Sequence, residues 1–214
     1  MKRICFIGAS TTEGMGDPSG LGWPGRLSAV KQGRVVSYNL GIRGQTVVQI
    51  ERRAVPEITA RITSYDQGGI VLGCPLNELP RNAVGDAFIE IAPALRRYEK
   101  LILSLKDIAP VIVVGPPPVA EAKLPFFSEV AEQDYYFKNT DIAAHDATMR
   151  DLCLSCGVTY ISVFQHLSKD VEYLAGLNVN DGLHTNGKGY AAQAVYLDKQ
   201  VDFQSFEPKN PSPA

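Results

Sequence analysis

The sequence predicts an α/β protein built on a parallel sheet, and three observations support this fold class. Short apolar runs of strand length alternate along the chain with longer stretches of helical period. Hydrophobic residues make up 45 % of the 214 residues, enough for a large core without disulfides or a metal. No internal repeat or linker-like stretch divides the chain. We therefore expect one domain over residues 1–206 and a disordered tail over 207–214, where three prolines fall without an apolar period.

Five strands are expected, because five short runs are rich in valine, isoleucine or aromatic residues and end near glycine, proline or asparagine. They cover residues 3–7, 35–39, 69–73, 111–114 and 159–163. Stretches of helical period lie between and after them. These expected helices cover residues 23–32, 46–64, 86–108, 133–156 and 186–203.

Prolines modify this pattern in three places. Pro56 and Pro93 fall inside two of the expected helices, so we expect a kink or a break at each. The three consecutive prolines at 116–118 should continue the fourth strand as a stiff, extended segment. Residues 120–132 should then form a long surface loop.

The charge balance narrows the choice of partners. Lysine plus arginine number 21 and aspartate plus glutamate number 23, which gives a net charge of −2. A surface this close to neutral argues against nucleic acid or an anionic membrane, so we expect a small-molecule ligand. No run of apolar residues is long enough to predict a membrane span. Four cysteines are few for a secreted disulfide scaffold, which favours reduced thiols and a cytoplasmic location.

In an open parallel sheet, ligands bind at the carboxyl ends of the strands, so the segments that follow the strands should carry the functional residues. The first expected strand ends in Gly8-Ala9-Ser10-Thr11, which places a serine beside small neighbours. Such a serine can be a nucleophile. A turn residue or a helix N-cap is the simpler alternative.

Motifs for phosphate binding are incomplete in this segment. No Lys-Ser/Thr pair follows Gly14, so the loop is not a P-loop, and Gly14-Met15-Gly16 lacks the third glycine of a dinucleotide fingerprint. Thr12 stands where the nucleophile elbow of α/β-hydrolases has its second glycine.

A nucleophilic serine needs a base, and the base needs a carboxylate that orients it. Asp181 precedes His184 by three residues with a glycine between them, so one short loop can supply both groups. The other histidines, His145 and His166, fall in an expected helix and in a polar segment, where a surface or structural role is simpler. His184 is therefore the candidate base.

Two further loops hold candidate donors for an oxyanion. Gly44 follows the second expected strand, and Asn77 follows the third. A glycine can present its backbone N–H at close range, and an asparagine side chain can donate from its amide. With the Ser10 N–H, these groups would form an oxyanion hole of three donors. Taken singly, Gly44 and Asn77 are each more typical of turns.

Taken together, these segments resemble the SGNH/GDSL hydrolase family. Its members carry a nucleophilic serine near the N-terminus, a glycine and an asparagine in the next two blocks, and a late Asp-x-x-His. The resemblance runs from the first expected strand to about residue 190. It places Ser10, Gly44, Asn77, Asp181 and His184 on these roles in the family's order. It implies a flavodoxin-like, three-layer α/β/α sandwich with a central five-stranded parallel sheet, and hydrolysis of esters or thioesters through an acyl-enzyme.

Three residues depart from the family's usual pattern. Ala9 stands where the nucleophile block usually has an aspartate, and Pro75 and Glu78 stand where the third block usually has glycine and aspartate. Ala9 removes a carboxylate that would help to organise the loop around Ser10. Pro75 stiffens the loop that carries Asn77 and removes one backbone donor. These changes bear on rate and substrate more than on the type of reaction.

The sequence thus favours a serine hydrolase acting on a small carboxylic ester or thioester, without a metal or organic cofactor. Two alternatives stay open. One is a ligand-binding relative whose altered blocks have lost turnover, and the other is a nucleotide-binding α/β domain. Acyl length, leaving group and oligomeric state do not follow from the sequence.

Two other features have simpler explanations. Cys153 and Cys156 have the spacing of redox motifs, but they end an expected helix, where a thiolate is not stabilised. The aromatic runs at 126–127 and 135–137 could line an acyl pocket or belong to the core.

Overall fold

A computed structural model describes residues 2–30, 35–63, 68–129, 131–201 and 206. Its centre is a five-stranded sheet in which every paired neighbour is parallel, with the strand order β2-β1-β3-β4-β7. The strands are β1 (Lys2–Gly8), β2 (Val35–Gly41), β3 (Gly68–Gly73), β4 (Val111–Val114) and β7 (Thr159–Ile161). All five expected strands are therefore confirmed, the last ending two residues early.

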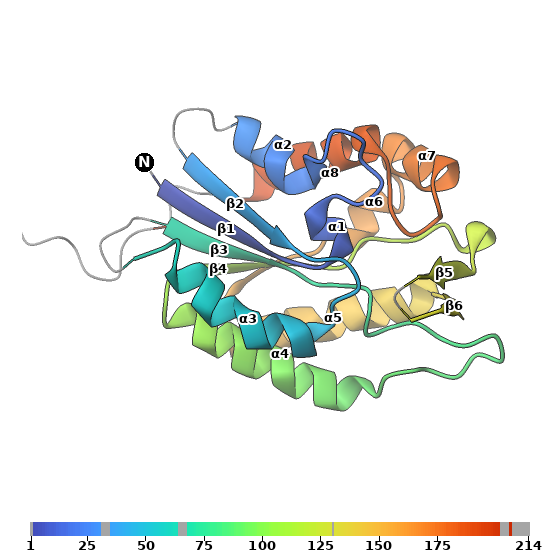
Figure 1. Cartoon of the computed structure of the whole chain (residues 1–214), viewed down its shortest axis with the longest axis horizontal. Helices are drawn as coiled ribbons and strands as arrows, with labels where there is room; N and C mark the ends of the chain where they lie inside the picture. Colours follow the sequence, from blue (N-terminus) through green and yellow to red (C-terminus); the bar gives the residue numbers. More distant parts are fainter. Residues whose placement is uncertain (1, 31–34, 64–67, 130, 202–205, 207–214) are drawn as a thin grey trace, which may run out of the picture.

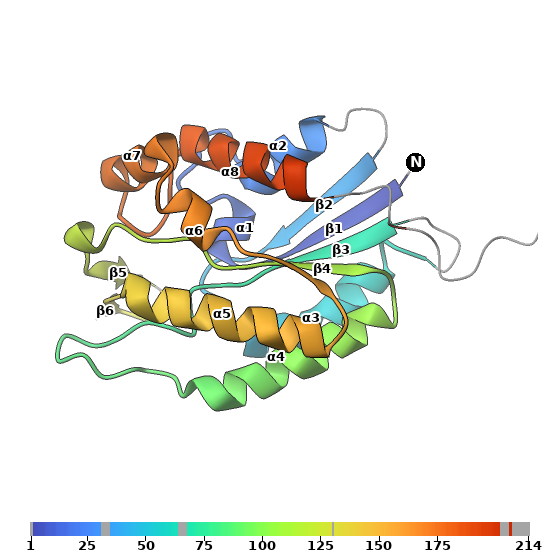
Figure 2. The ribbon, with the colours of Figure 1, turned by 180° about the vertical axis from the view of Figure 1, so that it is seen from behind.

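Helices cover both faces of the sheet (Figures 1 and 2). One face carries α3 (Val47–Thr59), α4 (Ile91–Lys106) and α5 (Asn139–Ser155). The other carries α1 (Ser10–Glu13), α2 (Gly22–Val30), α6 (Phe164–Leu167), α7 (Val171–Val179) and α8 (Gly187–Gln200). The expected three-layer α/β/α sandwich is thus confirmed. The expected tail, 207–214, and the expected ends of three helices lie outside the described residues.

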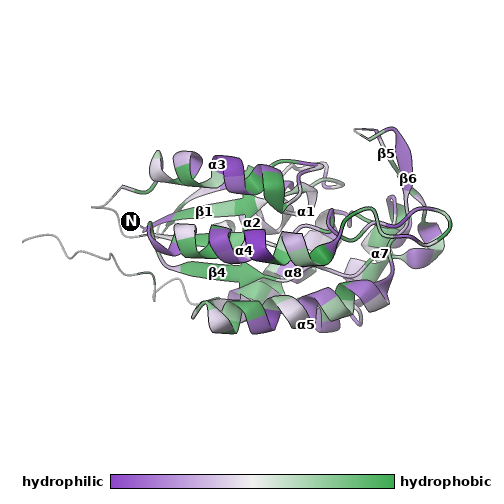
Figure 3. Cartoon of the chain, turned by 90° about the horizontal axis from the view of Figure 1, so that it is seen from below, coloured by the Kyte–Doolittle hydropathy of each residue, from purple (hydrophilic) through white to green (hydrophobic). Residues whose placement is uncertain are grey.

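The two sides of the core follow the alternation of side chains along each strand. In β1, Cys5 and Ile7 pack with α3, α4 and α5, whereas Ile4 and Phe6 pack with α2, α7 and α8. All four side chains are fully buried. Figure 3 shows the corresponding pattern of apolar strands between helices that are apolar on one side. Burial on both faces explains why the central strands β1, β3 and β4 contain continuous apolar runs in the sequence.

Neither internal proline ends its helix. Pro93 lies in the first turn of α4, where its missing N–H would have no partner within the helix. α3 continues past Pro56 to Thr59. The expected breaks are therefore wrong: Pro93 stands where a helix tolerates proline, and α3 continues although Pro56 removes one of its backbone hydrogen bonds.

The region after β4 differs from the prediction. A short 3-10 helix, η1 (Glu121–Lys123), and a strand, β5 (Phe126–Ser128), replace the expected loop. β5 pairs antiparallel with β6 (Gln133–Tyr135), where we expected the start of a helix. The helical period continues through these residues, but pairing with a distant segment decides their conformation. The hairpin stands out from the end of the sandwich in Figure 3.

Other helices also depart from the prediction. α4 begins at Ile91 and not at residue 86, because Asn82 Oδ1 accepts the N–H groups of Val84 and Asp86 and folds them into a turn. The helices α1, α6 and α7 were not expected. α7 is capped by Asp170, which accepts the Tyr173 N–H at 2.9 Å.

The order of the strands predicts where a binding site lies, namely at the carboxyl ends of the strands. The chain passes from β1 to β2 on one side and later to β3 on the other, so β1 and β3 flank the switch point. Their following helices, α2 and α4, lie on opposite faces (Figure 1). Such a reversal opens a crevice beyond the carboxyl ends of the strands, and the segments after β1, β2 and β3 border it.

Candidate active site

Ser10 follows β1 almost directly and begins the single turn of α1. The Ala9 carbonyl accepts the Thr12 N–H at 3.0 Å and the Glu13 N–H at 2.8 Å, which closes this turn. Because the turn begins at the carboxyl end of β1, the serine lies at the edge where the topology opens a crevice. Ser10 itself is 8 % exposed.

Thr12 fills the space beneath this turn. A Cβ atom on Gly8 would lie 2.2 Å from Thr12 Oγ1, and one on Gly73 would lie 2.4 Å from it. Neither approach is sterically possible for a side chain. The two glycines, in β1 and β3, therefore let the serine turn pack directly onto neighbouring strands.

The loop that carries Ser10 is held by contacts that the sequence did not indicate. Asn39 in β2 donates its amide to the Thr12 carbonyl at 2.9 Å. The Arg43 guanidinium pairs with the Glu13 carboxylate, with Nη2 and Oε1 2.7 Å apart. These contacts from the segment around the end of β2 hold the turn although Ala9 supplies no carboxylate. Asn39 ends the second expected strand, but no local pattern pointed to its partner.

His184 joins Ser10 and Asp181. Its Nε2 lies 2.8 Å from Ser10 Oγ, and its Nδ1 lies 2.8 Å from Asp181 Oδ2. With the proton on Nδ1, the ring donates to Asp181 and leaves Nε2 to accept from the serine hydroxyl. Phe126 packs edge-on against the imidazole, with ring centroids 5.5 Å apart. His184 is 2 % exposed, so its position is closely determined by these neighbours.

Asp181 is held as a carboxylate. Burial raises its pKa, but hydrogen bonds from the His184 ring and from the backbone N–H groups of His184 and Leu183 outweigh burial. The net pKa lies below the ordinary value. Asp181 Oδ1 accepts these N–H groups at 2.7 and 2.8 Å, while Oδ2 faces the ring. The short loop thus orients the carboxylate by itself, as its spacing suggested.

The two candidate oxyanion donors lie on neighbouring loops. Gly44 has φ +75°, a conformation that glycine adopts without strain. Asn77 Nδ2 donates to the Gln45 carbonyl at 2.8 Å, which ties the loop after β3 to the loop after β2. An amide nitrogen carries two hydrogens, and this bond uses one of them.

Glu78 makes a second connection between these loops. Its buried Oε1 accepts the N–H of Val47, the first residue of α3, whereas Oε2 and the nearby Tyr98 hydroxyl of α4 have no hydrogen-bond partner among the described residues. Burial raises the pKa of Glu78 to about 7, although the Val47 N–H and the nearby Tyr98 hydroxyl act to lower it. Where the family usually has an aspartate, this chain therefore has a longer acid that reaches the start of α3.

Ser10, Gly44, Asn77 and His184 line a common cavity of about 360 Å³, here named the Ser10 cavity. Its wall combines polar and apolar side chains and includes residues of the β5–β6 hairpin. Its apolar lining consists of Met15, Ile89, Phe126, Phe127, Ala131, Tyr135 and Leu183. Part of the aromatic run therefore lines the cavity, whereas Phe137 is buried in the core, 2 % exposed.

The other candidates from the sequence lie elsewhere. His166 is exposed and stacks on Tyr196, with ring centroids 4.1 Å apart. His145 is buried in α5, so of the surface and structural roles considered from the sequence, the surface role is excluded. Cys153 is also buried, and burial raises the pKa of its thiol to about 12, which disfavours the thiolate.

The described part of the chain holds neither a metal-ligand cluster nor a membrane-spanning helix. There, no group of three or more histidine, cysteine or acidic side chains is placed to hold a metal ion. Within the same residues, no helix has the length and apolarity needed to cross a bilayer.

Solved structures share this architecture. A lipase/acylhydrolase from Enterococcus faecalis aligns with a TM-score of 0.69 at 18 % identity, covering 98 % of this chain and 100 % of that one. An aryl esterase from M. smegmatis gives 0.68 at 16 %, covering 96 % and 100 %. An acetylxylan esterase from Geobacillus stearothermophilus gives 0.65 at 13 %, covering 94 % and 95 %. No curated protein matches the sequence.

These likenesses define the fold as that of the SGNH hydrolases. The sequence itself identifies the family: the model of the GDSL-like Lipase/Acylhydrolase family matches residues 6–192. The chain belongs to this family, as the arrangement of its motifs predicted. The match spans all five proposed site residues, from Ser10 to His184.

Proposed function

We propose that the protein is a serine hydrolase that cleaves a small carboxylic ester or thioester through an acyl-enzyme. The observation that carries this proposal is the chain of contacts Asp181–His184–Ser10, with both links at 2.8 Å. Its serine and histidine line a cavity that can admit a small molecule. The described residues offer no competing serine–histidine pair at hydrogen-bond distance.

In the first half of the reaction, Ser10 Oγ attacks the carbonyl carbon while His184 Nε2 takes the hydroxyl proton. Negative charge then develops on the carbonyl oxygen. The N–H groups of Ser10 and Gly44 and the second amide hydrogen of Asn77 stabilise it. When the tetrahedral intermediate collapses, the bond to the leaving oxygen or sulfur breaks and His184 returns the proton to it.

In the second half, a water molecule loses a proton to His184 and attacks the acyl carbon. The same donors stabilise the second oxyanion, and collapse releases the carboxylic acid and regenerates the Ser10 hydroxyl. Asp181 stays ionised throughout and stabilises the imidazolium each time it forms. Its lowered pKa supports this role.

The dimensions of the Ser10 cavity support a small substrate. A volume of about 360 Å³ is near the lower end of the range for small-molecule sites, roughly 300–1,000 Å³. The apolar lining suits a short acyl or aryl group. The structural relatives include an aryl esterase and an acetylxylan esterase, and both names describe esters with a compact group on one side.

A catalytically impaired, ligand-binding relative is the second candidate. The observation that favours it is the altered pattern at Ala9, Pro75 and Glu78. The contacts of Asn39 and Arg43 weaken this reading, because they hold the Ser10 turn without the missing carboxylate.

The two candidates are separated by treatment with a fluorophosphonate, followed by intact-mass analysis and peptide mapping. The hydrolase should gain one adduct on Ser10, and the His184→Ala variant should gain none at the same exposure. Turnover across esters of graded acyl length should accompany labelling. An unlabelled protein that hydrolyses no ester of the series would instead establish the binding-protein candidate.

A further inference from the structure

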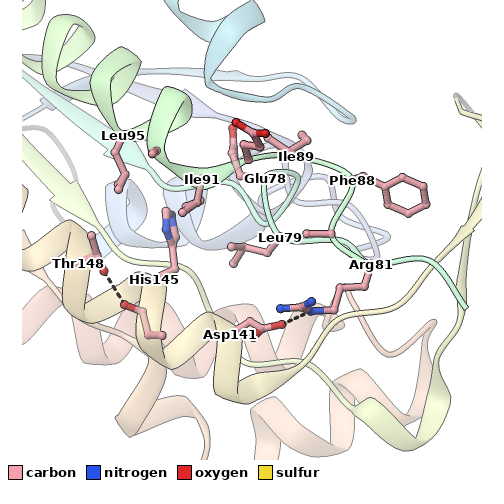
Figure 4. A pocket seen from close by; sticks show the side chains of 14 residues that line it. Glu78, Leu79, Arg81, Phe88, Ile89, Ile91, Leu95, Asp141, His145 and Thr148 are labelled. Atoms are coloured by element: carbon pink, nitrogen blue, oxygen red, sulfur yellow. Dashed lines mark hydrogen bonds and ion pairs between the residues drawn. The ribbon is translucent and has the colours of Figure 1, made fainter. Parts of the chain in front are cut away.

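A second cavity, of about 740 Å³, is drawn in Figure 4. It is bordered by the loop after β3, the start of α4 and the first half of α5. Ile89 lines both this cavity and the Ser10 cavity. Apolar side chains form much of the second cavity, among them Leu79, Phe88, Ile91 and Leu95.

His145 points from α5 into this region, between α4 and the loop (Figure 4). It is 3 % exposed, and neither ring nitrogen has a hydrogen-bond partner among the described residues. Burial lowers its pKa to about 4, so at neutral pH the ring is uncharged. A neutral imidazole has one N–H donor and one acceptor nitrogen. Buried polar groups are rarely left unpaired in this way.

The one arginine that lines the cavity is already paired with a carboxylate. The Arg81 guanidinium pairs with the Asp141 carboxylate at 2.5 Å, and both side chains are about one quarter exposed. Glu78 Oε1 accepts the Val47 N–H, whereas Glu78 Oε2 has no hydrogen-bond partner among the described residues. Arg81 therefore does not favour an anion, because its charge is already balanced. Among these side chains, His145 is the one whose polar atoms all lack a partner within the described residues.

We propose that the second cavity binds a neutral, hydroxyl-bearing apolar molecule, whose hydroxyl group hydrogen-bonds to the His145 ring. A hydroxyl both donates and accepts, so it can pair with a neutral imidazole. The apolar walls take up the hydrocarbon part of the ligand. The proposal does not depend on Ser10 chemistry, because the residues that carry it lie outside the Ser10 cavity.

The probe is 4-propylphenol. Binding is followed by NMR, as the change in chemical shift of the histidine ring carbons in the ¹³C-labelled, folded protein. The chain has three histidines, which single substitutions assign. Saturable movement of the His145 signal is expected, without movement of the His166 signal. The ether 4-propylanisole, which cannot donate, should bind at least ten-fold more weakly. Movement confined to the His184 signal would assign the phenol to the Ser10 cavity and overturn the proposal.

Two variants test the location. Ala144 is exposed on α5 and lines the second cavity, whereas Ala147 is exposed on the same helix outside its lining. Ala144→Phe should weaken the Kd for 4-propylphenol at least ten-fold, and Ala147→Phe should leave it within two-fold. Equal Kd values in both variants would refute the site.

A third variant tests the role of the ring nitrogens. His145→Phe keeps a planar ring and removes both unpaired nitrogens, so the free protein should melt at a higher temperature while the affinity for 4-propylphenol falls at least ten-fold. Retained affinity in His145→Phe would contradict the proposed hydrogen bond. If that variant does not fold, the Ala144 and Ala147 pair decides the question.

Discussion

At the scale of single residues, the site depends on a few short polar contacts made by buried groups. His184 is almost fully buried, yet each of its ring nitrogens faces a polar atom at 2.8 Å. Burial without such partners would be costly, as with any polar group removed from water. The same environment makes these contacts strong, because little water competes for them.

Replacing Ser10 by alanine tests the proposed nucleophile. The variant should lose at least ~10⁴-fold in kcat for its best ester, since no other group can form the acyl-enzyme. Its melting temperature should stay close to that of the parent. Ser37→Ala, at an exposed position in β2, is the matched control and should keep full activity. Retention of a tenth of the activity in Ser10→Ala would rule out the assigned role.

At the scale of elements, the loops at the edge of the sheet are cross-connected. The loop after β3 is joined to the loop after β2 by Asn77 and to the start of α3 by Glu78. A second anchored segment precedes α2, where Asp17 accepts the Gly22 N–H at 2.9 Å and pairs with Arg26. The strands and helices fix where each loop begins and ends, and the hydrogen bonds of these side chains fix the positions of the loops relative to one another.

Asn77→Ala should lower kcat by roughly 10²–10³-fold with little change in KM, because the amide is proposed to act on the developing oxyanion. Part of any loss could come from the broken bond to Gln45, which would also lower thermal stability. The melting temperature separates the two effects, because losing the bond to the Gln45 carbonyl lowers it, whereas losing only the oxyanion donor lowers kcat. Glu78→Gln should lower kcat less than Asn77→Ala does. Equal losses in Asn77→Ala and Glu78→Gln would mean that the loop acts only as a scaffold.

Asp17 should contribute pH-dependent stability. Burial raises its pKa, but hydrogen bonds from Arg26, Ser19 and Gly22 outweigh this and lower the pKa to about 2 from 3.8. The stabilisation is present above the unfolded-state pKa and is lost as the pH falls through about 2. About 2 kcal/mol of the free energy of unfolding should disappear over this window.

Urea unfolding between pH 5 and pH 2 measures this loss. Asp17→Asn should already lack the contribution at pH 5 and show a shallower decline, whereas Asp151→Asn, at an exposed position in α5, should follow the parent. Parallel curves for Asp17→Asn and the parent would contradict the assignment.

At the scale of the whole molecule, the sheet separates two apolar cores, and the site lies where the connections leave it. Glu78 connects several elements of one side, since it contacts α3 and α4 from the loop after β3. Its carboxyl is 2 % exposed, so its charge state affects the packing of that whole side.

The raised pKa of Glu78 predicts that the free energy of unfolding falls as the pH rises, which is opposite to the pH dependence predicted for Asp17. With a folded-state pKa of about 7 against 4.5, the protonated form is favoured in the fold. Stability from this group is fully present below pH 4.5 and is lost as the pH rises through about 7. The loss should be on the order of 3 kcal/mol by pH 8.

Chemical denaturation from pH 5 to pH 8 tests this in Glu78→Gln, which cannot ionise and should show a flatter curve than the parent. Glu99→Gln is the control, because Glu99 is exposed in α4 beside Tyr98. A parent whose stability is unchanged between pH 5 and pH 8 would show that the buried carboxyl is not linked to folding.

The sequence by itself determined the layers of the fold and the local part of the site. Strands buried on both faces must be apolar throughout, so their runs could be recognised without structural information. The Asp181–His184 pair was equally visible, because three residues with an intervening glycine form one local loop. The family match then agreed with the order of the motifs.

The tertiary structure alone decided the contacts between distant segments. Ser10 and His184 are 174 residues apart, and only the strand order brings them to one edge. The hairpin of β5 and β6 follows from pairing across a turn, which outweighs the helical period of its second strand. Asn39, Glu78 and the unpaired His145 have no local signature, since their surroundings come from other elements. The packing between helices and strands depends on every element of the fold together, so it cannot be predicted from the periodicity of residues along the chain.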